Sequence, residues 1–320
     1  MPGWLADISS KVGSLIGNRT PSAHFGAFGK HPGWNDHLDD LGLDSEPLIA
    51  AKQYIYVQGI GGVVDAGLWE ALPSAEALAE FRHIFVWMDG RDALVGKLWS
   101  SSDGKGRTKY PMVVCAHFSN RTQSRLPDLV PLLDQLEQSC RATTSADDVR
   151  RLIAQARHSA ALLLNAPPIE ETPKIEFAGD LGLDPSSEAS ARIAYSAESH
   201  FAPLGATGIA RTRINLKLGQ FNGQPQHIRV PAIPGRPFAS HRFWHDFLAE
   251  HIPASAPQLY IVPIASPWLD VIVGLPTAKQ LFCLRAGEKV VPLASQIPFT
   301  LTGEFRAKAA DRWRGFLKGA

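Results

Sequence analysis

Two pairs of short apolar segments limit the folds that this chain can adopt. Residues 84–88 and 94–99 are rich in β-branched and aromatic side chains, and the turn Asp89-Gly90-Arg91-Asp92 joins them. Residues 259–264 and 268–273 form a second pair with an even shorter connection. Parallel strands need a crossover of a dozen or more residues, so connections this short join antiparallel strands. The chain is therefore predicted to contain a mainly antiparallel sheet.

Other segments alternate between strand and helix patterns along the chain. Close strand pairs followed by clustered helices favour an α+β fold, with the sheet flanked by helices, over a doubly wound parallel sheet. Gly59-Ile60-Gly61-Gly62 is expected to interrupt a helix at a place where another element packs closely, and residues 63–72 are expected to resume it. Further strands are predicted at 24–29, 112–118 and 209–218, and helices at 46–59, 129–140, 146–164 and 240–251.

The length of 320 residues suggests two subdomains, because a domain has on the order of 150 residues. An N-terminal segment, 1–20, carries Trp4, Leu5, Ile8 and Val12 at the spacing of an amphipathic helix. Residues 166–190, rich in Pro, Glu, Asp and Gly, have the composition of a linker. The predicted organisation is a first domain over 21–165, this linker, and a second α+β subdomain over 191–320.

Composition excludes several classes of protein. The 32 basic and 31 acidic residues leave a formal charge of +1, which gives no attraction for nucleic acid or an anionic membrane. With 45% hydrophobic residues the chain can build a sizeable core. No apolar run reaches the roughly 18 residues of a membrane span, and no secretory signal is visible. The three cysteines form neither a CxxC pair nor a disulfide framework. We therefore expect a cytoplasmic protein with no membrane insertion and no nucleic-acid partner.

The loop Asp103-Gly104-Lys105-Gly106-Arg107 is the main candidate for binding chemistry. Its two glycines allow backbone N–H groups to converge on one point, and Lys105, Arg107 and Lys109 add positive charge, so it could hold a phosphate or carboxylate. The alternative is a tight loop in which Asp103 accepts hydrogen bonds from its own backbone and Arg107 pairs with a carboxylate. Ser102 and Lys105 have the spacing of serine acyl-enzymes, but the glycines deny the helix that such a site needs.

Two histidine pairs could serve as metal ligands. His241 and His245 lie four residues apart on a predicted helix, but the interleaved aromatic residues indicate a packed amphipathic helix instead. His31 and His37 flank an acidic loop and could bind a metal with Asp39 or Asp40, although turn-forming Asp and Asn explain the loop without one. We predict no metal site, no cofactor and no catalytic residues.

Two motifs resemble those of the TagF family, which is associated with type VI secretion. The first, Phe28-Gly29-Lys30-His31-Pro32, leads to Gly33-Trp34-Asn35-Asp36, where the family has aromatic-Gly-Lys-x-Pro followed by Gly-Asp-Phe. The second, residues 102–111, is similar to the family's Ser-x-Asp-x-x-Gly-Arg-x-aromatic-Pro. The matched positions are Gly29, Lys30, Pro32 and Asp36 in the first motif and Ser102, Asp103, Gly106, Arg107, Tyr110 and Pro111 in the second.

The resemblance covers about residues 24–120, with a fainter similarity at 259–284. Residues 120–256 match no part of the family pattern. Asn35 replaces the family's glycine, His37 its aromatic residue, and Ser101 the proline before the serine. The chain is also longer than a minimal family domain. The resemblance therefore indicates a divergent, longer member.

The resemblance implies a non-enzymatic accessory or regulatory protein of a bacterial type VI secretion system. Such a protein acts post-translationally in the cytoplasm through protein–protein contacts, and its partners include a forkhead-associated scaffold protein or another secretion component. Lys30, Asp36, Ser102, Asp103, Lys105 and Arg107 are then candidates for binding a partner or anion, and Gly29, Pro32, Gly106, Tyr110 and Pro111 for shaping the loops. Alternatively, Asp36 and Arg107 would pair with each other, and the two motifs would then have a structural role. Two alternatives remain, a structural subunit of a contractile injection machine and a phosphate-handling hydrolase that uses the Asp103–Arg107 loop.

Overall fold

The computed structural model describes residues 23–78, 80–89, 92–118, 128–163, 174–206, 224–253 and 256–319. The amphipathic helix predicted for residues 1–20 and the strand predicted at 209–218 lie outside these residues. None of the helices in the described ranges has both the length and the apolar character needed to cross a bilayer.

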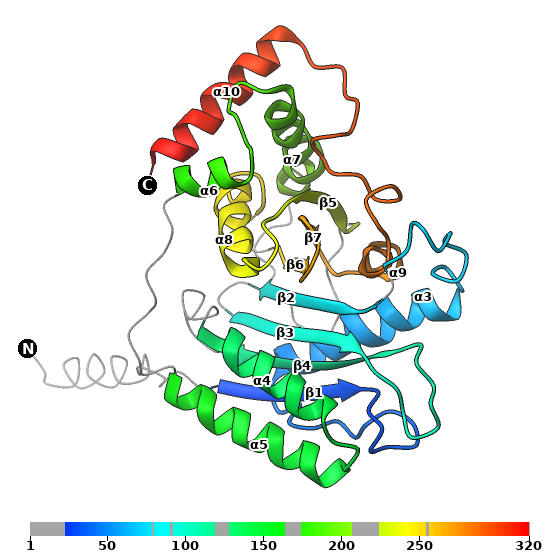
Figure 1. Cartoon of the computed structure of the whole chain (residues 1–320). Helices are drawn as coiled ribbons and strands as arrows, with labels where there is room; N and C mark the ends of the chain where they lie inside the picture. The colour runs from blue at the N-terminus through cyan, green and yellow to red at the C-terminus, as the bar shows by residue number, and fades with distance from the viewer. Residues whose placement is uncertain are drawn as a thin grey trace, which may run out of the picture.

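A seven-stranded sheet in the order β1-β4-β3-β2-β6-β7-β5 forms the centre of the molecule, and every neighbouring pair is antiparallel (Figure 1). This confirms the predicted mainly antiparallel sheet in an α+β fold. Both short-connection pairs, β2–β3 and β6–β7, are present as predicted. The strands are β1 (Ala23–Gly29), β2 (Arg82–Asp89), β3 (Asp92–Ser100), β4 (Pro111–Phe118), β5 (Gln226–Pro231), β6 (Gln258–Pro263) and β7 (Trp268–Val273).

Both faces of the sheet are covered, and the strands alternate between two hydrophobic clusters. On β4, Met112 and Val114 belong to one cluster, whereas Val113 and Cys115 belong to the other. The first cluster packs against α4 (Val130–Arg141), α5 (Ala146–Leu163), α6 (Lys174–Asp180), α7 (Glu188–Ala206), α8 (Pro237–Leu248) and α10 (Gly303–Lys318). The second packs against α2 (Glu46–Ala51), the π-helical η1 (Lys52–Gly61), α3 (Gly62–Asp65), α9 (Ala278–Leu281) and the 3₁₀ helix η3 (Phe282–Leu284). In Figure 1, α4 and α5 lie along the part of the sheet that holds β1, β4 and β3, and α7, α8 and α10 gather at its other end.

The predicted helix break at Gly59–Gly62 was wrong, because the helix continues through α2, η1 and α3. The close packing expected at these glycines is present. A Cβ at Gly59 would lie 2.7 Å from Leu281 Cγ, and one at Gly62 would lie 3.0 Å from Ala278 Cβ. Glycine therefore allows α9 to approach the helix, which continues through this segment as a π-helix rather than ending.

The sheet joins the two halves of the chain, because β2 pairs with β6 from His83↔Pro263 to Met88↔Gln258. The predicted linker 166–190 lies partly outside the described residues, and its remainder contains α6 and the start of α7. Phe177 and Ala178 of α6 are buried in the first cluster. These residues therefore pack on the core, while the boundaries of the two subdomains stay a prediction.

Candidate functional site

The two family-like motifs meet because β1 and β4 are neighbours. Gly29 at the end of β1 pairs with Met112 at the start of β4, and Lys30 N–H donates to the Pro111 carbonyl at 3.1 Å. The loop that follows β1 therefore lies against the loop that precedes β4. Gly29 has a φ of +111°, and a Cβ there would lie 2.3 Å from the Pro111 oxygen, so this position requires glycine.

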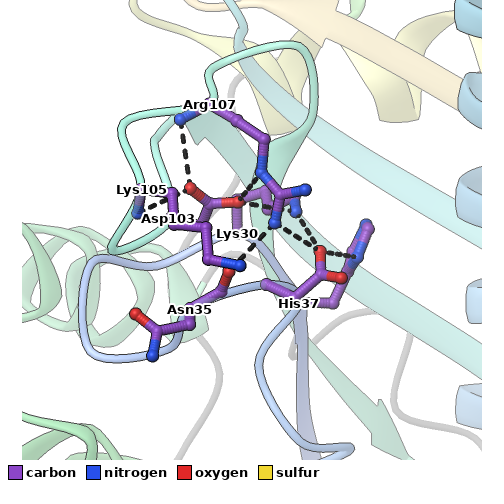
Figure 2. A network of polar contacts seen from close by, with 7 residues as sticks. Lys30, Asn35, His37, Asp103, Lys105 and Arg107 are labelled. Carbon is purple, nitrogen blue, oxygen red and sulfur yellow. Dashed lines mark hydrogen bonds and ion pairs between the residues drawn. The ribbon is translucent and has the colours of Figure 1, made fainter.

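A buried ion pair connects the loops. Lys30 Nζ lies 2.9 Å from Asp103 Oδ2, and the exposed fractions of the two side chains are 4% and 0% (Figure 2). Lys30 Nζ also donates to Asp36 Oδ1 at 2.5 Å. One ammonium therefore binds a carboxylate from each motif, which fixes the two loops relative to each other.

The Asp103 carboxylate fills the concave loop that its own motif forms. Its Oδ1 accepts hydrogen bonds from the backbone N–H groups of Lys105 and Arg107, each at 3.0 Å, and its Oδ2 accepts one from Arg107 Nε at 2.6 Å. Burial opposes ionisation of Asp103, but the hydrogen bonds from Lys30 and Arg107 hold its pKa well below the usual range. A phosphate would have to displace this carboxylate, so the geometry favours the tight-loop alternative over the anion site.

A second ion pair lies toward solvent. Arg107 Nη2 lies 3.0 Å from Asp36 Oδ1 and donates to the Asn35 carbonyl at 2.9 Å. The Asp36 side chain is 67% exposed and that of Arg107 50%. The hydrogen bond from Lys30 lowers the pKa of Asp36 against the effect of burial, and the charge of Arg107 lowers it further. Arg107 therefore contacts residue 35 through its backbone carbonyl rather than through its side chain.

The remaining motif residues shape the two loops. Gly106 has a φ of +77°, which glycine adopts without strain, and a Cβ at Gly104 would lie 3.1 Å from the Pro32 carbonyl. The ring of Tyr110 packs against His37 at a centroid distance of 5.2 Å. Lys105 contributes its backbone N–H to the network. Among the described residues, no side-chain hydrogen bond of Ser102 is present. The binding roles of these residues stay predictions.

Neither histidine pair singled out from the sequence belongs to a group of three metal-ligating side chains among the described residues. Gly33 N–H donates to His31 Nδ1 at 3.0 Å, so His31 Nε2 carries the proton and donates to the Cys140 carbonyl at 2.9 Å. Both ring nitrogens of His31 are therefore engaged. The rings of His241 and His245 stack at 5.9 Å, with His241 buried against Tyr260.

One polar cluster was not predicted from the sequence. In the described part of the chain, only His227, Asp270 and Cys283 bring three metal-ligating side chains within 4.8 Å of one another. Arg229, opposite Asp270 in the β5–β7 register, donates from Nε to Asp270 Oδ1 at 2.8 Å and from Nη2 to Oδ2 at 2.9 Å. His227 Nε2 lies 2.8 Å from the same Oδ1. Both carboxylate oxygens are thus occupied, and the cluster is a buried ion pair rather than a ligand set.

Comparisons with known proteins give little further information. No protein-family model matches the chain, and no curated protein matches it. The crystal structure of PA0076 from Pseudomonas aeruginosa PAO1, at 2.05 Å resolution, is similar over 87% of this chain and 99% of that chain, with 15% sequence identity and a TM-score of 0.39. A similarity this distant carries no argument about function, which depends here on the chain's own motifs and geometry.

Proposed function

We propose that this chain is a non-enzymatic accessory or regulatory protein of a bacterial type VI secretion system. It acts in the cytoplasm through contact with another secretion protein, for which a forkhead-associated scaffold protein is our first candidate. The proposal depends on the TagF-like motifs and on the way their residues are arranged.

The observation that carries the proposal is the meeting of the two motifs in one ion network. Lys30 and Asp36 of the first motif bind Asp103 and Arg107 of the second. The inner pair, Lys30–Asp103, is buried, whereas Asp36 and Arg107 remain half or more exposed. The network therefore has a structural part and an accessible part. Loops held rigidly by a scaffold and carrying exposed charges are typical of recognition surfaces.

The alternative of a phosphate-handling hydrolase gains no support from this geometry. A phosphate site needs backbone or side-chain donors that are free to receive it. The N–H groups of Lys105 and Arg107 already donate to Asp103, and the Arg107 guanidinium is shared between Asp36 and Asp103. We therefore place the function of the loops in protein recognition.

The test is binding of the purified protein to a purified forkhead-associated scaffold protein from a type VI system, measured by calorimetry. Asp36→Ala and Arg107→Ala should each weaken binding about ten-fold or more, the effect of losing a well-placed contact of about 1.4 kcal/mol. The matched control is the exposed pair Asp311–Arg314 on α10, whose side chains are 76% and 51% exposed. Asp311→Ala and Arg314→Ala should leave binding unchanged.

Two results would contradict the proposal. Either the wild-type protein binds neither the scaffold nor any other purified secretion component, or the loop variants fold and bind as tightly as the Asp311 and Arg314 controls. Stable incorporation into isolated sheath or baseplate particles would instead support the structural-subunit alternative.

A further inference from the structure

A pocket of about 340 Å³ opens beside the ion network, between the end of β1, the loop after it and the helix α2–η1–α3. His37, Tyr56 and Tyr110 form its aromatic wall, and Asp40, Lys52 and Asp65 also line it. The pocket is not part of the network, but His37 connects the two, because its Nδ1 lies 3.1 Å from Asp36 Oδ1. The volume lies within the range of natural ligand sites.

The π-helical segment η1, including Gly61 at its end, forms one wall of the pocket. Tyr56, Val57 and Gly61 all belong to η1 and all line the pocket. A Cβ at Gly61 would lie 3.9 Å from Tyr110 Oη, so a side chain at this position would extend toward the opposite wall. The backbone at Gly61 has φ −56° and ψ −49°, which any residue can adopt. Space in the pocket, rather than backbone strain, is thus what Gly61 provides.

The polar atoms of the pocket are rich in hydrogen-bond acceptors. The Asp36 carboxylate can only accept, so His37 Nδ1 donates to it and His37 Nε2 carries a lone pair. Burial, followed by the charge of Lys30, lowers the pKa of His37 and keeps the ring neutral at pH 7. The Tyr56 hydroxyl is buried and has no hydrogen-bond partner among the described residues. A buried hydroxyl without a partner is costly, so a ligand that supplied a hydrogen-bond partner here would be stabilised.

The charges that line the pocket are unbalanced. Lys52 Nζ lies 2.5 Å from both oxygens of Asp40 and neutralises that carboxylate. Asp65 is exposed and forms no ion pair within the described ranges. Its charge acts on Tyr110, whose pKa is raised by burial and then by Asp65, while the charges of Lys30 and Lys109 act in the opposite direction. The lining therefore has one uncompensated negative charge beside electron-rich rings, which together attract a cation.

The helix that forms one wall of the pocket carries exposed apolar side chains, and one of them, Val57, also lines the pocket. Ile49 of α2 is 53% exposed and Val57 of η1 is 48% exposed. Exposed large aliphatic residues next to a polar pocket are typical of a protein contact, in which the apolar rim packs against the chain that bears the inserted side chain.

We propose that this pocket receives a lysine or arginine side chain from the partner protein, with its alkyl stem on the Val57 rim and its cationic head among His37, Tyr56 and Asp65. This inference rests on the proposed function only in taking the partner to be a protein. An ammonium or guanidinium brings three to five donors and no acceptor, which matches the acceptor-rich lining. An anion would be repelled by Asp65 and by the negative faces of the rings, and an uncharged group would gain nothing from the charge of Asp65.

The test uses short peptides with blocked ends, because the preference of the pocket for a cationic side chain can be measured without knowing the partner's sequence. Acetyl-Gly-Arg-Gly-amide and acetyl-Gly-Lys-Gly-amide are titrated into the full chain and followed by saturation-transfer NMR. The control probe is acetyl-Gly-citrulline-Gly-amide, which has the shape of arginine without its charge. We expect the cationic peptides to bind about ten-fold more tightly than the citrulline peptide, as a desolvated cation–π contact combined with one carboxylate allows.

Variants at the pocket wall locate the binding. Gly61→Leu should fill the pocket and abolish peptide binding, whereas the matched Gly61→Ala adds one methyl group and should retain it. Tyr56→Phe removes only the hydroxyl and Asp65→Asn only the charge, and each should weaken binding several-fold while thermal unfolding shows an intact fold. Equal binding of the citrulline peptide, or unchanged binding by Gly61→Leu, would overturn the inference.

The same variants separate this inference from the proposed function. If the secretion partner binds the wild type and Gly61→Leu equally, the pocket inference fails and the proposed function stands. If the cationic peptides bind and Gly61→Leu abolishes that binding, the pocket stands even where no secretion protein binds the chain.

Discussion

Lys30 Nζ lies 2.9 Å from Asp103 Oδ2, with both side chains buried, although the two residues are 73 positions apart in sequence. Removing two charges from water is costly, and only close pairing with further hydrogen bonds offsets that cost. Asp103 gains its further hydrogen bonds from Arg107 and the loop backbone. The buried pair therefore fixes the position of the loops, and the exposed Asp36 and Arg107 depend on it for their geometry.

Replacing Lys30 with methionine should destabilise the fold by about 3–5 kcal/mol, the cost of leaving a buried partner charge uncompensated. Urea denaturation measures the free energy of unfolding. Lys52→Met is the control, because Lys52 pairs with Asp40 at a half-exposed site where an ion pair contributes about 1 kcal/mol or less. In the Lys30→Met background, Asp103→Asn should restore part of the stability. Equal losses for Lys30→Met and Lys52→Met would contradict the structural role of the inner pair.

Gly96 is required by the sheet, and alanine there should destabilise the protein by about 1–3 kcal/mol, as overpacking of a core does. A Cβ at Gly96 would lie 2.2 Å from Cζ of Phe85, its neighbour across β2–β3, and 2.9 Å from Cys115 Cβ on β4. The matched control is Gly315→Ala on α10, where no atom lies within 4 Å of the added Cβ. It should stabilise the helix by up to about 1 kcal/mol. Thermal shifts of the same sign for both variants would argue against this packing.

The central part of the sheet was predictable because it depends on local signals. The short connections within 84–99 and 259–273 determine antiparallel pairs without any knowledge of the rest of the chain. Strand β5 was missed, since only Ile228 and Val230 carry its alternation, and the buried Arg229 between them is explained only by Asp270 across the sheet. Helix α10 was missed although the sequence contains a signal for it. Thr302 is a good N-cap residue, and its side chain accepts a hydrogen bond from Phe305 N–H, while apolar residues follow at helical spacing.

The candidate site was only partly predictable, because some of its contacts depend on segments that are distant in sequence. The sequence motifs predicted the residues of both loops and raised the Asp36–Arg107 pair as one of two alternatives. The inner Lys30–Asp103 pair depends on the β1–β4 register, and strand order between distant segments has no local signal. The pocket depends on η1, whose glycines indicated a break in the helix. The π-helix found in their place lies against α9, which is more than 200 residues further along the chain.

Stability should fall as the pH drops below 6.5. Burial lowers the pKa of His83 to about 4 and that of His241 to about 3, against about 6.5 in the unfolded chain. Below pH 6.5 the unfolded state therefore binds protons that the folded state does not, which decreases the free energy of unfolding by about 1.4 kcal/mol per pH unit for each histidine. The loss from His83 ends near pH 4 and that from His241 near pH 3.

A single variant tests this pH dependence. In the wild type the His241 and Tyr260 rings meet edge to face with their centroids 4.6 Å apart. His241→Phe keeps this contact and removes a buried Nε2 that has no partner among the described residues. It should reduce the slope between pH 6 and 4 by about 1.4 kcal/mol per unit, whereas above pH 7 the stabilities of variant and wild type should run parallel. Urea titrations at stepped pH give both curves. An unchanged slope would mean that His241 is not buried in its neutral form.

Added transition metal should leave the protein unaffected at the His227–Asp270–Cys283 cluster. Arg229 occupies both oxygens of Asp270, and burial raises the pKa of the Cys283 thiol, so the thiolate that a metal needs is disfavoured. We expect equimolar Co²⁺ to give no thiolate charge-transfer absorption and no rise in the melting temperature. A charge-transfer band that disappears in Cys283→Ser would show that the arginine yields its place to a metal.

Removing one partner of the Arg229–Asp270 pair should lower the free energy of unfolding more than replacing both partners with apolar residues. Asp270→Asn leaves the guanidinium buried without its carboxylate and should destabilise the fold by about 3–5 kcal/mol. Arg229 would still donate to the Ala286 and Val291 carbonyls and lie 4.8 Å over the Trp268 ring. The double variant Arg229→Met, Asp270→Val removes both charges from the β5–β7 pair and should recover most of that loss, since well-packed apolar side chains replace a buried ion pair at little cost. Urea denaturation of the three proteins gives the coupling energy. A double variant less stable than Asp270→Asn would mean that the carbonyl contacts of Arg229, rather than its ion pair, hold η3 and the following segment against β5.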